Sequence, residues 1–302
     1  MKEITIIIPF YNREAFLEKT LQSLANCQWR PLRLILVDNG STDGSRQLCE
    51  KFAETYHSSH FQIVVAEEPK RGAAVARNKG LALCETEFVY FFDSDDAFDP
   101  TFLPTVIPLL TDDIDLLAVT TRQVVGEKTQ VRAYRKTASP KAQVLVSHLN
   151  TVAMVLRTDF LRKVGGWNET LTTWDDWELG LRVLLAKPRM RWFTKQPFHE
   201  TYVHAESQTG DGFSSRIDAV RRAMEVAVKE APRYSSALYY RMEILTGELL
   251  KEKNLTAANT NKKLICEWFA GKSVWTKTIG RLLRFYVSKG GRGAWRLAYL
   301  FC

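Results

Sequence analysis

The sequence predicts an α/β protein, with a mostly parallel central sheet flanked by helices and a mainly helical region at its C-terminal end. Over the first hundred residues, short apolar runs alternate with segments of helical periodicity, the pattern of a parallel sheet with helices on both faces. The runs are apolar almost throughout, as expected of strands covered on both faces. After about residue 215 nearly the whole chain shows helical patterns.

The first expected strand covers residues 3–10, where the β-branched run "EITIIIPF" is ended by a proline. A helix is expected over residues 13–27, because its apolar side chains recur on one helical face. The remaining strands expected in this part cover residues 32–39, 61–67 and 87–94, and the helices cover residues 45–56 and 73–84.

From about residue 114 to residue 157 the pattern changes. The segments "DLLAVTTRQVV" and "VRAYR" predict a hairpin, and "NTVAMVLR" predicts a further strand. A short helix follows in "TDFLRKVGG", where two glycines end it. The segment "WDDWELGLRVLLA", residues 174–186, predicts a longer helix with Trp177, Leu181 and Leu184 in register.

The length of 302 residues allows one large domain or two moderate ones, and we expect domains over residues 1–214 and 215–302. The hydrophobic fraction of 45% and the charged fraction of 25% are those of a globular protein. The five cysteines are scattered and odd in number, which predicts reduced thiols and a cytoplasmic location. The apolar run at the N-terminus is too short for a signal peptide, and no segment has the length of a membrane span.

The net charge of +8 is concentrated in the C-terminal part. Residues 211–302 hold 17 Lys/Arg and 8 Asp/Glu, a difference of +9, whereas residues 1–210 hold 25 and 26, a difference of −1. After Glu267 no acidic residue follows. This distribution predicts an anionic surface as partner, although a basic helical face in water would have the same composition.

Ligands of open α/β sheets bind beyond the carboxyl ends of the strands, so the residues at these ends are the first candidates for a site. An aromatic ring follows the first strand, hydrogen-bond acceptors follow the second, and cations follow the third. These side chains are Tyr11, Asp38, Asn39, Lys70 and Arg71.

The fourth strand ends in "FFDSDD", which brings Asp93, Asp95 and Asp96 to one point. Carboxylates this close repel one another, and a divalent cation is the compensation that we expect. Ligation by oxygen alone suits Mg²⁺ or Mn²⁺, which usually bridge to substrate phosphates. The alternative is that these carboxylates cap a helix starting near Asp99.

Five segments, in order and with fitting spacing, resemble the motifs of the family 2 glycosyltransferases. They are "TIIIPFYNREAFLEKTLQSL", "LILVDNGSTDGS", "RGAAVARNKGLAL", "FVYFFDSDD" and "VGGWNETLTTWDDWELGLRV". The resemblance covers about residues 1–210 and implies the GT-A fold of that family. It also implies a nucleotide-diphosphate sugar as donor, most often a UDP-sugar, and inversion at the anomeric carbon.

The resemblance also implies roles for individual residues. Pro9 and Tyr11 would contact the base, and Asp38 would accept a hydrogen bond from the uracil imide. The remaining residues implied in nucleotide-sugar binding are Arg71, Arg77, Asn78, Asp93, Ser94, Gly166 and Trp167.

Asp95 and Asp93 would bind Mn²⁺ or Mg²⁺, with Asp95 in direct contact, and His204 would complete the metal site. Many relatives have a second aspartate where this chain has Asn39, which leaves only neutral hydrogen bonding at that position.

The segment "WDDWE" resembles the acidic pair that supplies the catalytic base in this family, with Asp176 as the base and Asp175 beside it. A single carboxylate can take the proton from an attacking hydroxyl, and a metal can stabilise the departing diphosphate, so no separate general acid is needed. An N-terminal helix position favours an ionised aspartate. Trp174 and Trp177 could stack on a sugar, although Trp177 fits a core position equally well.

The sequence thus predicts a metal-dependent inverting glycosyltransferase acting on a glycan or lipid-linked glycan, with no nucleic-acid partner. A nucleotidyltransferase is one alternative, but it would carry a glycine-rich, lysine-bearing loop where this chain has "PFYNRE". A decayed, non-catalytic binding module is another, but it would have lost the paired aspartates or the acidic pair.

The basic tail allows two interpretations. In "WTKTIGRLLRFYV", Trp275, Ile279, Leu282 and Tyr286 share one helical face, and Lys277, Arg281 and Arg284 are expected on the opposite one. Such a helix can lie in a membrane interface, which predicts peripheral contact of residues 272–302 with the cytoplasmic membrane face. It can equally pack its apolar stripe on the rest of the protein.

Overall fold

The computed structural model describes residues 2–27, 29–125, 128–132, 139–203 and 212–302. Contacts divide the chain into two compact units, which we describe separately. The first comprises Met1–Lys136, Leu149–Thr172 and Ala186–Ser207, and the second comprises Thr137–His148, Thr173–Leu185 and Gln208–Cys302. The second unit therefore adds two earlier segments to the C-terminal helices. The domain boundary predicted after residue 214 stays a proposal.

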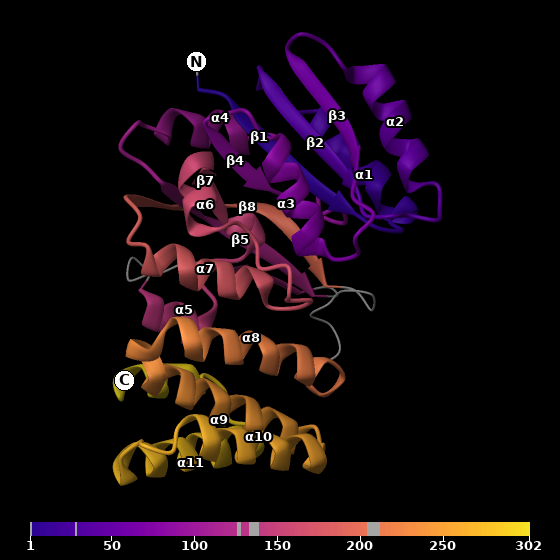
Figure 1. Cartoon of the computed structure of the whole chain (residues 1–302). Coiled ribbons are helices and arrows are strands. Elements are labelled where there is room, and N and C mark those ends of the chain that lie inside the picture. Colours follow the sequence, from indigo (N-terminus) through magenta and orange to yellow (C-terminus); the bar gives the residue numbers. More distant parts are fainter. Residues whose placement is uncertain (1, 28, 126–127, 133–138, 204–211) are drawn as a thin grey trace. The chain divides into compact units, whose positions relative to one another are not determined.

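The first unit contains a mixed sheet of eight strands in the order β3-β2-β1-β4-β7-β5-β6, with β8 paired to β5 (Figure 1). β1 to β4 run parallel, and β7 joins them antiparallel to both β4 and β5. This α/β architecture confirms the predicted fold class. The strands are β1 (Ile4–Phe10), β2 (Leu32–Asp38), β3 (Phe61–Glu67), β4 (Phe88–Phe91), β5 (Leu116–Val125), β6 (Lys128–Arg132), β7 (Met154–Arg157) and β8 (Met190–Val203).

Helices cover both faces of the parallel strands. One core cluster packs alternate residues of β1, such as Ile6 and Ile8, against Leu21 of α1 and Phe52 of α2. On the other face α3 lies so close that Gly80 touches Ile7, where a Cβ would not fit. The helices of this unit are α1 (Glu14–Ala25), α2 (Ser45–Tyr56), α3 (Ala73–Leu83), α4 (Phe102–Val106) and α6 (Thr158–Val164), with 3₁₀ turns at Ile107–Leu109 and Thr151–Ala153.

β8 has no counterpart among the predicted elements, and it contains an irregularity. Val119 of β5 pairs with Phe193 and Thr121 pairs with Phe198, so residues 194–197, including a proline, bulge opposite a single residue. The bulge is followed by His199, a buried residue with a φ of 52°. Its Nδ1 accepts a hydrogen bond from the Asp99 backbone at 3.0 Å, and burial lowers its pKa to about 3. His199 is therefore a neutral core residue.

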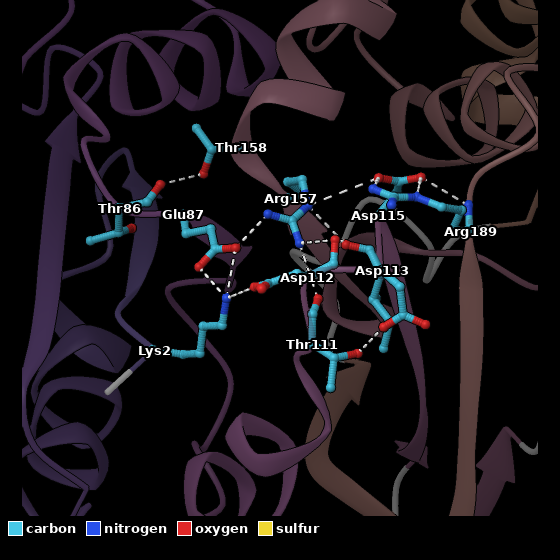
Figure 2. Close-up of polar contacts among 11 residues, drawn as sticks. Lys2, Thr86, Glu87, Thr111, Asp112, Asp113, Asp115, Arg157, Thr158 and Arg189 are labelled. Atoms are coloured by element: carbon cyan, nitrogen blue, oxygen red, sulfur yellow. Dashed lines mark hydrogen bonds and ion pairs between the residues drawn. The ribbon is translucent and has the colours of Figure 1, made fainter.

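An ion network joins five segments of the chain at the amino ends of the parallel strands (Figure 2). Arg157, at the end of β7, contacts Glu87 at 2.5 Å and the carbonyl oxygens of Ile114 and Thr111 at 2.9 and 3.0 Å. Lys2 also donates to Glu87, at 2.7 Å, and Arg189 pairs with Asp115 at 2.7 Å. These contacts lie at the end of the sheet opposite to the loops that the sequence predicts as the site.

The second unit is helical and is organised around α9, which packs against α8, α10 and α11 (Figure 1). α12 also packs against α9. α9 buries residues around most of its circumference, as expected of a central helix. Its helices are α5 (Pro140–Val146), α7 (Asp175–Leu185), α8 (Ile217–Glu230), α9 (Ser235–Lys251), α10 (Leu255–Trp268), α11 (Val274–Ser288) and α12 (Ala294–Leu300), with 3₁₀ turns at Ser214–Arg216 and Pro232–Tyr234.

All five cysteines are free thiols, as the sequence predicts. Within the described ranges, no helix combines the length and the apolarity that crossing a bilayer would require.

Candidate active site

The loops after β1 and β2 are joined by hydrogen bonds at the carboxyl end of the sheet. Asp38 is 2% exposed, and its Oδ1 accepts a hydrogen bond from the Ser41 backbone at 2.9 Å. Asn12, with a φ of 49°, donates its backbone N–H to the Ser41 hydroxyl, and its side chain accepts from the Thr42 backbone at 2.8 Å. The turn after β2 is therefore fixed by Asp38 on its own strand and by Asn12 of the loop after β1.

Asn39 connects this turn to the loop after β3. Its amide nitrogen donates to the carbonyl oxygens of Glu68 and Lys70, both at 2.8 Å. Its Oδ1 accepts from the backbone of Gly72 at 2.8 Å, just before α3 begins. A side chain that donates twice and accepts once is required here, which a carboxylate cannot provide. The neutral hydrogen bonding that the sequence suggested for Asn39 is what the structure shows.

Arg71 connects the loop after β3 to the loop after β1. Its guanidinium group lies 3.3 Å from the centre of the Tyr11 ring, and Nη1 donates to the Asn39 carbonyl oxygen at 2.6 Å. Tyr11 is 40% exposed, so part of its ring remains open to solvent. Two residues predicted to bind the nucleotide are thus in direct contact.

Two of the aspartates after β4, Asp93 and Asp95, each lie close to an arginine. Asp93 accepts from Arg77 of α3 at 3.0 Å, and the Arg77 guanidinium stacks 4.4 Å from the Trp167 ring. Asp95 lies 3.9 Å from Nε of Arg13. The two arginines therefore offset part of the charge of Asp93 and Asp95, for which the sequence predicted a divalent cation.

The turn that carries the aspartates is fixed by Thr20 of α1. Its hydroxyl group is placed to donate to the carbonyl oxygens of Ser94 and Asp96, at 3.0 and 2.8 Å. Ser94 and Asp96 are themselves buried, whereas the side chains of Asp93 and Asp95 are 34% and 19% exposed. The two predicted metal ligands are the accessible carboxylates of this turn.

Asn78 joins α3 to the glycine pair before Trp167. Its Oδ1 accepts from the Trp167 backbone at 2.8 Å, and its Nδ2 donates to the Trp167 carbonyl oxygen at 2.9 Å. Gly166 has a φ of +65°, and a Cβ there would lie 2.7 Å from Asn78 Oδ1. Only glycine fits this approach. Trp167 is 2% exposed and packs edge-on against Phe91 of β4, so it is a core residue that packs beneath the exposed residues of the site.

Glu169 completes this corner of the first unit. It accepts hydrogen bonds from Lys70 at 2.6 Å and from Asn78 at 3.0 Å, and these donors lower its pKa. Glu169, Thr20 and Arg13 are not among the residues that the sequence predicts for the site. Arg13 could have been found, because it lies three residues after the end of the first expected strand.

The acidic pair lies in the second unit, at the first two positions of α7. Asp175 is 9% exposed, whereas Asp176 is more exposed and accepts from the Trp177 backbone at 2.6 Å. Trp177 is a core residue, 1% exposed, whose indole donates to the Gln143 carbonyl oxygen at 2.9 Å. Trp174 packs on Trp177 and against the Arg241 guanidinium. The idea that Trp177 stacks on a sugar is therefore wrong.

Two further predictions have a limited outcome. His204 lies outside the described residues, as does most of the segment after it. Pro9 lies at the end of β1 and is half-buried. Among the described residues, no group of three or more histidine, cysteine or acidic side chains is placed to hold a metal ion.

The model of a known family, Glycosyl transferase family 2, matches residues 5–168. The pre-mycofactocin glycosyltransferase of Mycobacterium tuberculosis is 32% identical over 203 residues, which are 63% of this chain and 41% of that protein. The chain spans less than half the length of the first curated relatives that it matches.

Solved structures share the fold at low sequence identity. S. aureus TarS, residues 1–349 in complex with UDP-GlcNAc, has a TM-score of 0.71 at 16% identity, covering 99% of this chain and 91% of that chain. The mannosyltransferase PcManGT from Pyrobaculum calidifontis, in complex with GDP-Man and Mn²⁺, has a TM-score of 0.59 at 16% identity, covering 99% of this chain and 86% of that chain.

Proposed function

The chain belongs to glycosyl transferase family 2, and from this premise we propose that it transfers a sugar from a UDP-sugar to a hydroxyl group of a glycan or lipid-linked glycan. One observation carries the proposal. Tyr11, Asp38, Arg71 and Asp93 come from four different strand ends and gather at the carboxyl edge of one parallel sheet. This edge is where open α/β sheets bind ligands. Binding of UDP-GlcNAc by TarS, a protein of the same fold, supports the choice of donor.

The nucleotide is proposed to bind against Tyr11 and Asp38. The Arg71 guanidinium covers part of the Tyr11 ring, and the base of the nucleotide stacks on the part of the ring that remains exposed. Asp38 has one carboxylate oxygen engaged by Ser41, and the other accepts the imide N–H of uracil. Because Asn39 fixes both neighbouring loops, these groups are positioned before the nucleotide arrives.

Asp95 and Asp93 are proposed to hold Mn²⁺ or Mg²⁺. Two accessible carboxylates fit the way these ions are bound, since the other ligands are usually phosphate oxygens and water. When bound, the ion would offset the negative charge of the departing diphosphate. Arg77 orients Asp93 through its ion pair, and Trp167 fixes Arg77 through stacking.

Asp176 is proposed as the general base of an inverting reaction. Its carboxylate takes the proton from the acceptor hydroxyl as the oxygen attacks the anomeric carbon, and the bond to the diphosphate breaks. Asp176 is preferred to Asp175 because it is the more exposed of the two. Its position in the first turn of α7 favours the ionised form.

The proposal is tested by incubating the full chain with UDP-, GDP- and dTDP-sugars and measuring free nucleotide with and without Mn²⁺. We expect release of UDP that needs the ion and is lost after EDTA treatment. UDP affinity is measured in parallel for the wild type and for Asp95→Ala, with Asp99→Ala as a nearby control.

A metal-bound donor predicts that EDTA and Asp95→Ala weaken UDP binding to the same extent and that their effects do not add. Equal UDP affinity in every condition would disprove the metal site. Failure to release nucleotide from any of the sugars, with UDP binding intact, would indicate a binding module instead.

A further inference from the structure

We propose that α11 and α12 form an interfacial docking surface for an anionic lipid bilayer. This inference is independent of the proposed reaction, because it concerns only helices of the second unit. It rests on three observations: where the exposed apolar side chains lie, what holds α11 in its orientation, and which charges surround the apolar surface.

Exposed apolar side chains are concentrated on these two helices and the residues beside them. Of the twelve large hydrophobic side chains that are exposed among the described residues, eight lie between Val274 and Phe301. Trp275 is 69% exposed, and Leu282 and Phe285 are each 62% exposed. Apolar surface concentrated in this way marks an interaction site.

The orientation of α11 is fixed by its opposite side. Ile279, Leu283 and Val287 are buried and face α9, and Gly280 lies against the ring of Tyr239 so closely that a Cβ would not fit. Arg284 pairs with the buried carboxylate of Glu243 at 3.1 Å. α11 therefore buries one set of apolar side chains against its own unit, and it leaves a second set, which includes Trp275, Leu282 and Phe285, exposed.

These contacts correct the expected pattern of the helix. Ile279 is buried, as expected if the apolar stripe packs on the rest of the protein. Trp275, Leu282 and Tyr286 are exposed, as expected if the stripe lies in a membrane interface. Arg284 turns inward to Glu243 and does not belong to a basic stripe on the surface.

The exposed apolar side chains border a groove between α11 and α12. Its volume is about 780 Å³, and its walls include Trp275, Leu282 and Tyr286 on one side and Leu297 and Phe301 on the other. Tryptophan and tyrosine are suited to a membrane interface, because each has an apolar ring and a polar group that stays hydrated.

The charges of these helices favour an anionic partner, and Lys289 lines the groove itself. Residues 268–302 contain seven lysines and arginines and no acidic residue. Arg281, Lys289, Arg292 and Arg296 are exposed. An anionic bilayer complements this charge, and aromatic, aliphatic and basic side chains together are typical of helices that lie in an interface. In a symmetric pairing of two copies, the same cations would face one another, which disfavours a dimer through this surface.

The test is co-sedimentation of the full chain with vesicles of phosphatidylcholine, alone or mixed with phosphatidylglycerol, at low and high salt. We expect binding to the mixed vesicles at low salt, and release at high salt or without the anionic lipid. Removing three of the exposed charges should weaken the partition onto mixed vesicles about 100-fold. That variant is Arg281→Gln/Arg292→Gln/Arg296→Gln, and its control with the same charge change is Arg233→Gln/Lys253→Gln/Lys263→Gln.

A second pair of variants tests the apolar part of the surface. Leu282→Asn/Phe285→Asn should lose binding, whereas Leu255→Asn/Val131→Asn, which changes exposed residues elsewhere, should keep it. Thermal unfolding of each variant verifies that these surface changes leave the fold intact.

Three outcomes overturn the proposal. The first is that the full chain stays in the supernatant with anionic vesicles at low salt. The second is that the two triple Lys/Arg→Gln variants lose vesicle binding equally, which would show that the net charge of the protein, and not the surface of α11 and α12, attracts it to anionic lipid. The third is that sedimentation velocity without lipid finds a dimer that Leu282→Asn/Phe285→Asn dissociates, while that variant still binds vesicles as the wild type does.

Discussion

Asn39 shows how a single amide group can determine the geometry of a site. Three backbone segments meet at this residue, since its own N–H donates to the Phe10 carbonyl oxygen and its side chain reaches Glu68, Lys70 and Gly72 in the loop after β3. The residue is 6% exposed, so water cannot replace these partners. Its role is to hold three strand ends in register, without direct participation in the chemistry.

Asn39→Asp is expected to destabilise the protein by about 2–3 kcal/mol, because a buried carboxylate would face two carbonyl oxygens to which it cannot donate. UDP affinity should fall with it, since the loops before and after the turn lose their connection. The free energy of unfolding, measured by denaturant titration, tests the first statement. Asn259→Asp makes the same change on the surface of α10 and should be neutral. An Asn39→Asp protein as stable as the wild type would contradict this explanation.

Asp176→Asn removes the proposed base and keeps the size and the hydrogen bond to the Trp177 backbone. We expect kcat to fall at least about 100-fold, the range for loss of a general base, with nearly unchanged UDP affinity. Steady-state kinetics and calorimetric titration with UDP measure the two effects separately. Asp175→Asn serves as the comparison. If that change abolishes turnover and Asp176→Asn is mild, the assignment within the pair is reversed.

At the scale of elements, the strands and helices up to residue 91 could be predicted because local pattern and tertiary packing agree there. The helix predicted over residues 45–56 and the strand predicted over residues 61–67 have the observed bounds. β8 could not be predicted in this way, since a strand interrupted by Pro197 and several charged residues lacks periodicity. Only its pairing with β5 and the bulge explain why the segment is extended.

The same limit applies to the site. Tyr11, Asp38 and Asp93 could be found because they lie at or just after the carboxyl ends of strands, and the ends of parallel strands meet at one edge. Glu169 follows no strand, and its partner Asn78 is 91 positions earlier in the chain. No local pattern could have connected the two.

The start of α10 depends on one side chain. Asn254 accepts a hydrogen bond from the Ala257 backbone at 3.0 Å, which satisfies a donor that the helix itself leaves without a partner. Asn254→Ala should therefore cost about 1 kcal/mol of stability. Asn259→Ala, in the exposed interior of the same helix, should change stability by no more than a few tenths of a kcal/mol, and in the favourable direction. Thermal melts of both variants compare the two positions, and equal melting temperatures would refute the capping role.

At the scale of the whole molecule, the ion network of Figure 2 makes stability depend on pH. Burial alone would raise the pKa of Glu87, but the hydrogen bonds from Lys2 and Arg157 lower it overall, and Arg189 lowers the pKa of Asp115. A carboxylate with a lowered pKa stabilises the fold above its ordinary pKa of about 4, and that contribution is lost as the pH falls through the lowered value.

The unfolding temperature should therefore fall as the pH drops below about 4. Arg157→Met should lower the unfolding temperature at neutral pH and make the acid-induced fall shallower, because Glu87 loses one of its two cations. Arg233→Met, at an exposed position of the second unit, is the control. An acid-induced fall that is equally steep in wild type and Arg157→Met would show that the network does not link stability to pH.

The assignment of α5 and α7 to the second unit has a consequence for how the protein is made. A ribosome completes the chain from the N-terminus, so both helices emerge before α8 and α9, the helices on which they pack. The strands β1 to β4 have no such delay, because all four are translated before α5. The nascent chain can therefore form early the sheet edge that is proposed to bind the nucleotide, while the helix bearing Asp176 waits for partners that are not yet translated. A ribosome stalled before α9 would therefore present the strand ends of the proposed donor site, while the unit that carries the proposed base is still without its central helix.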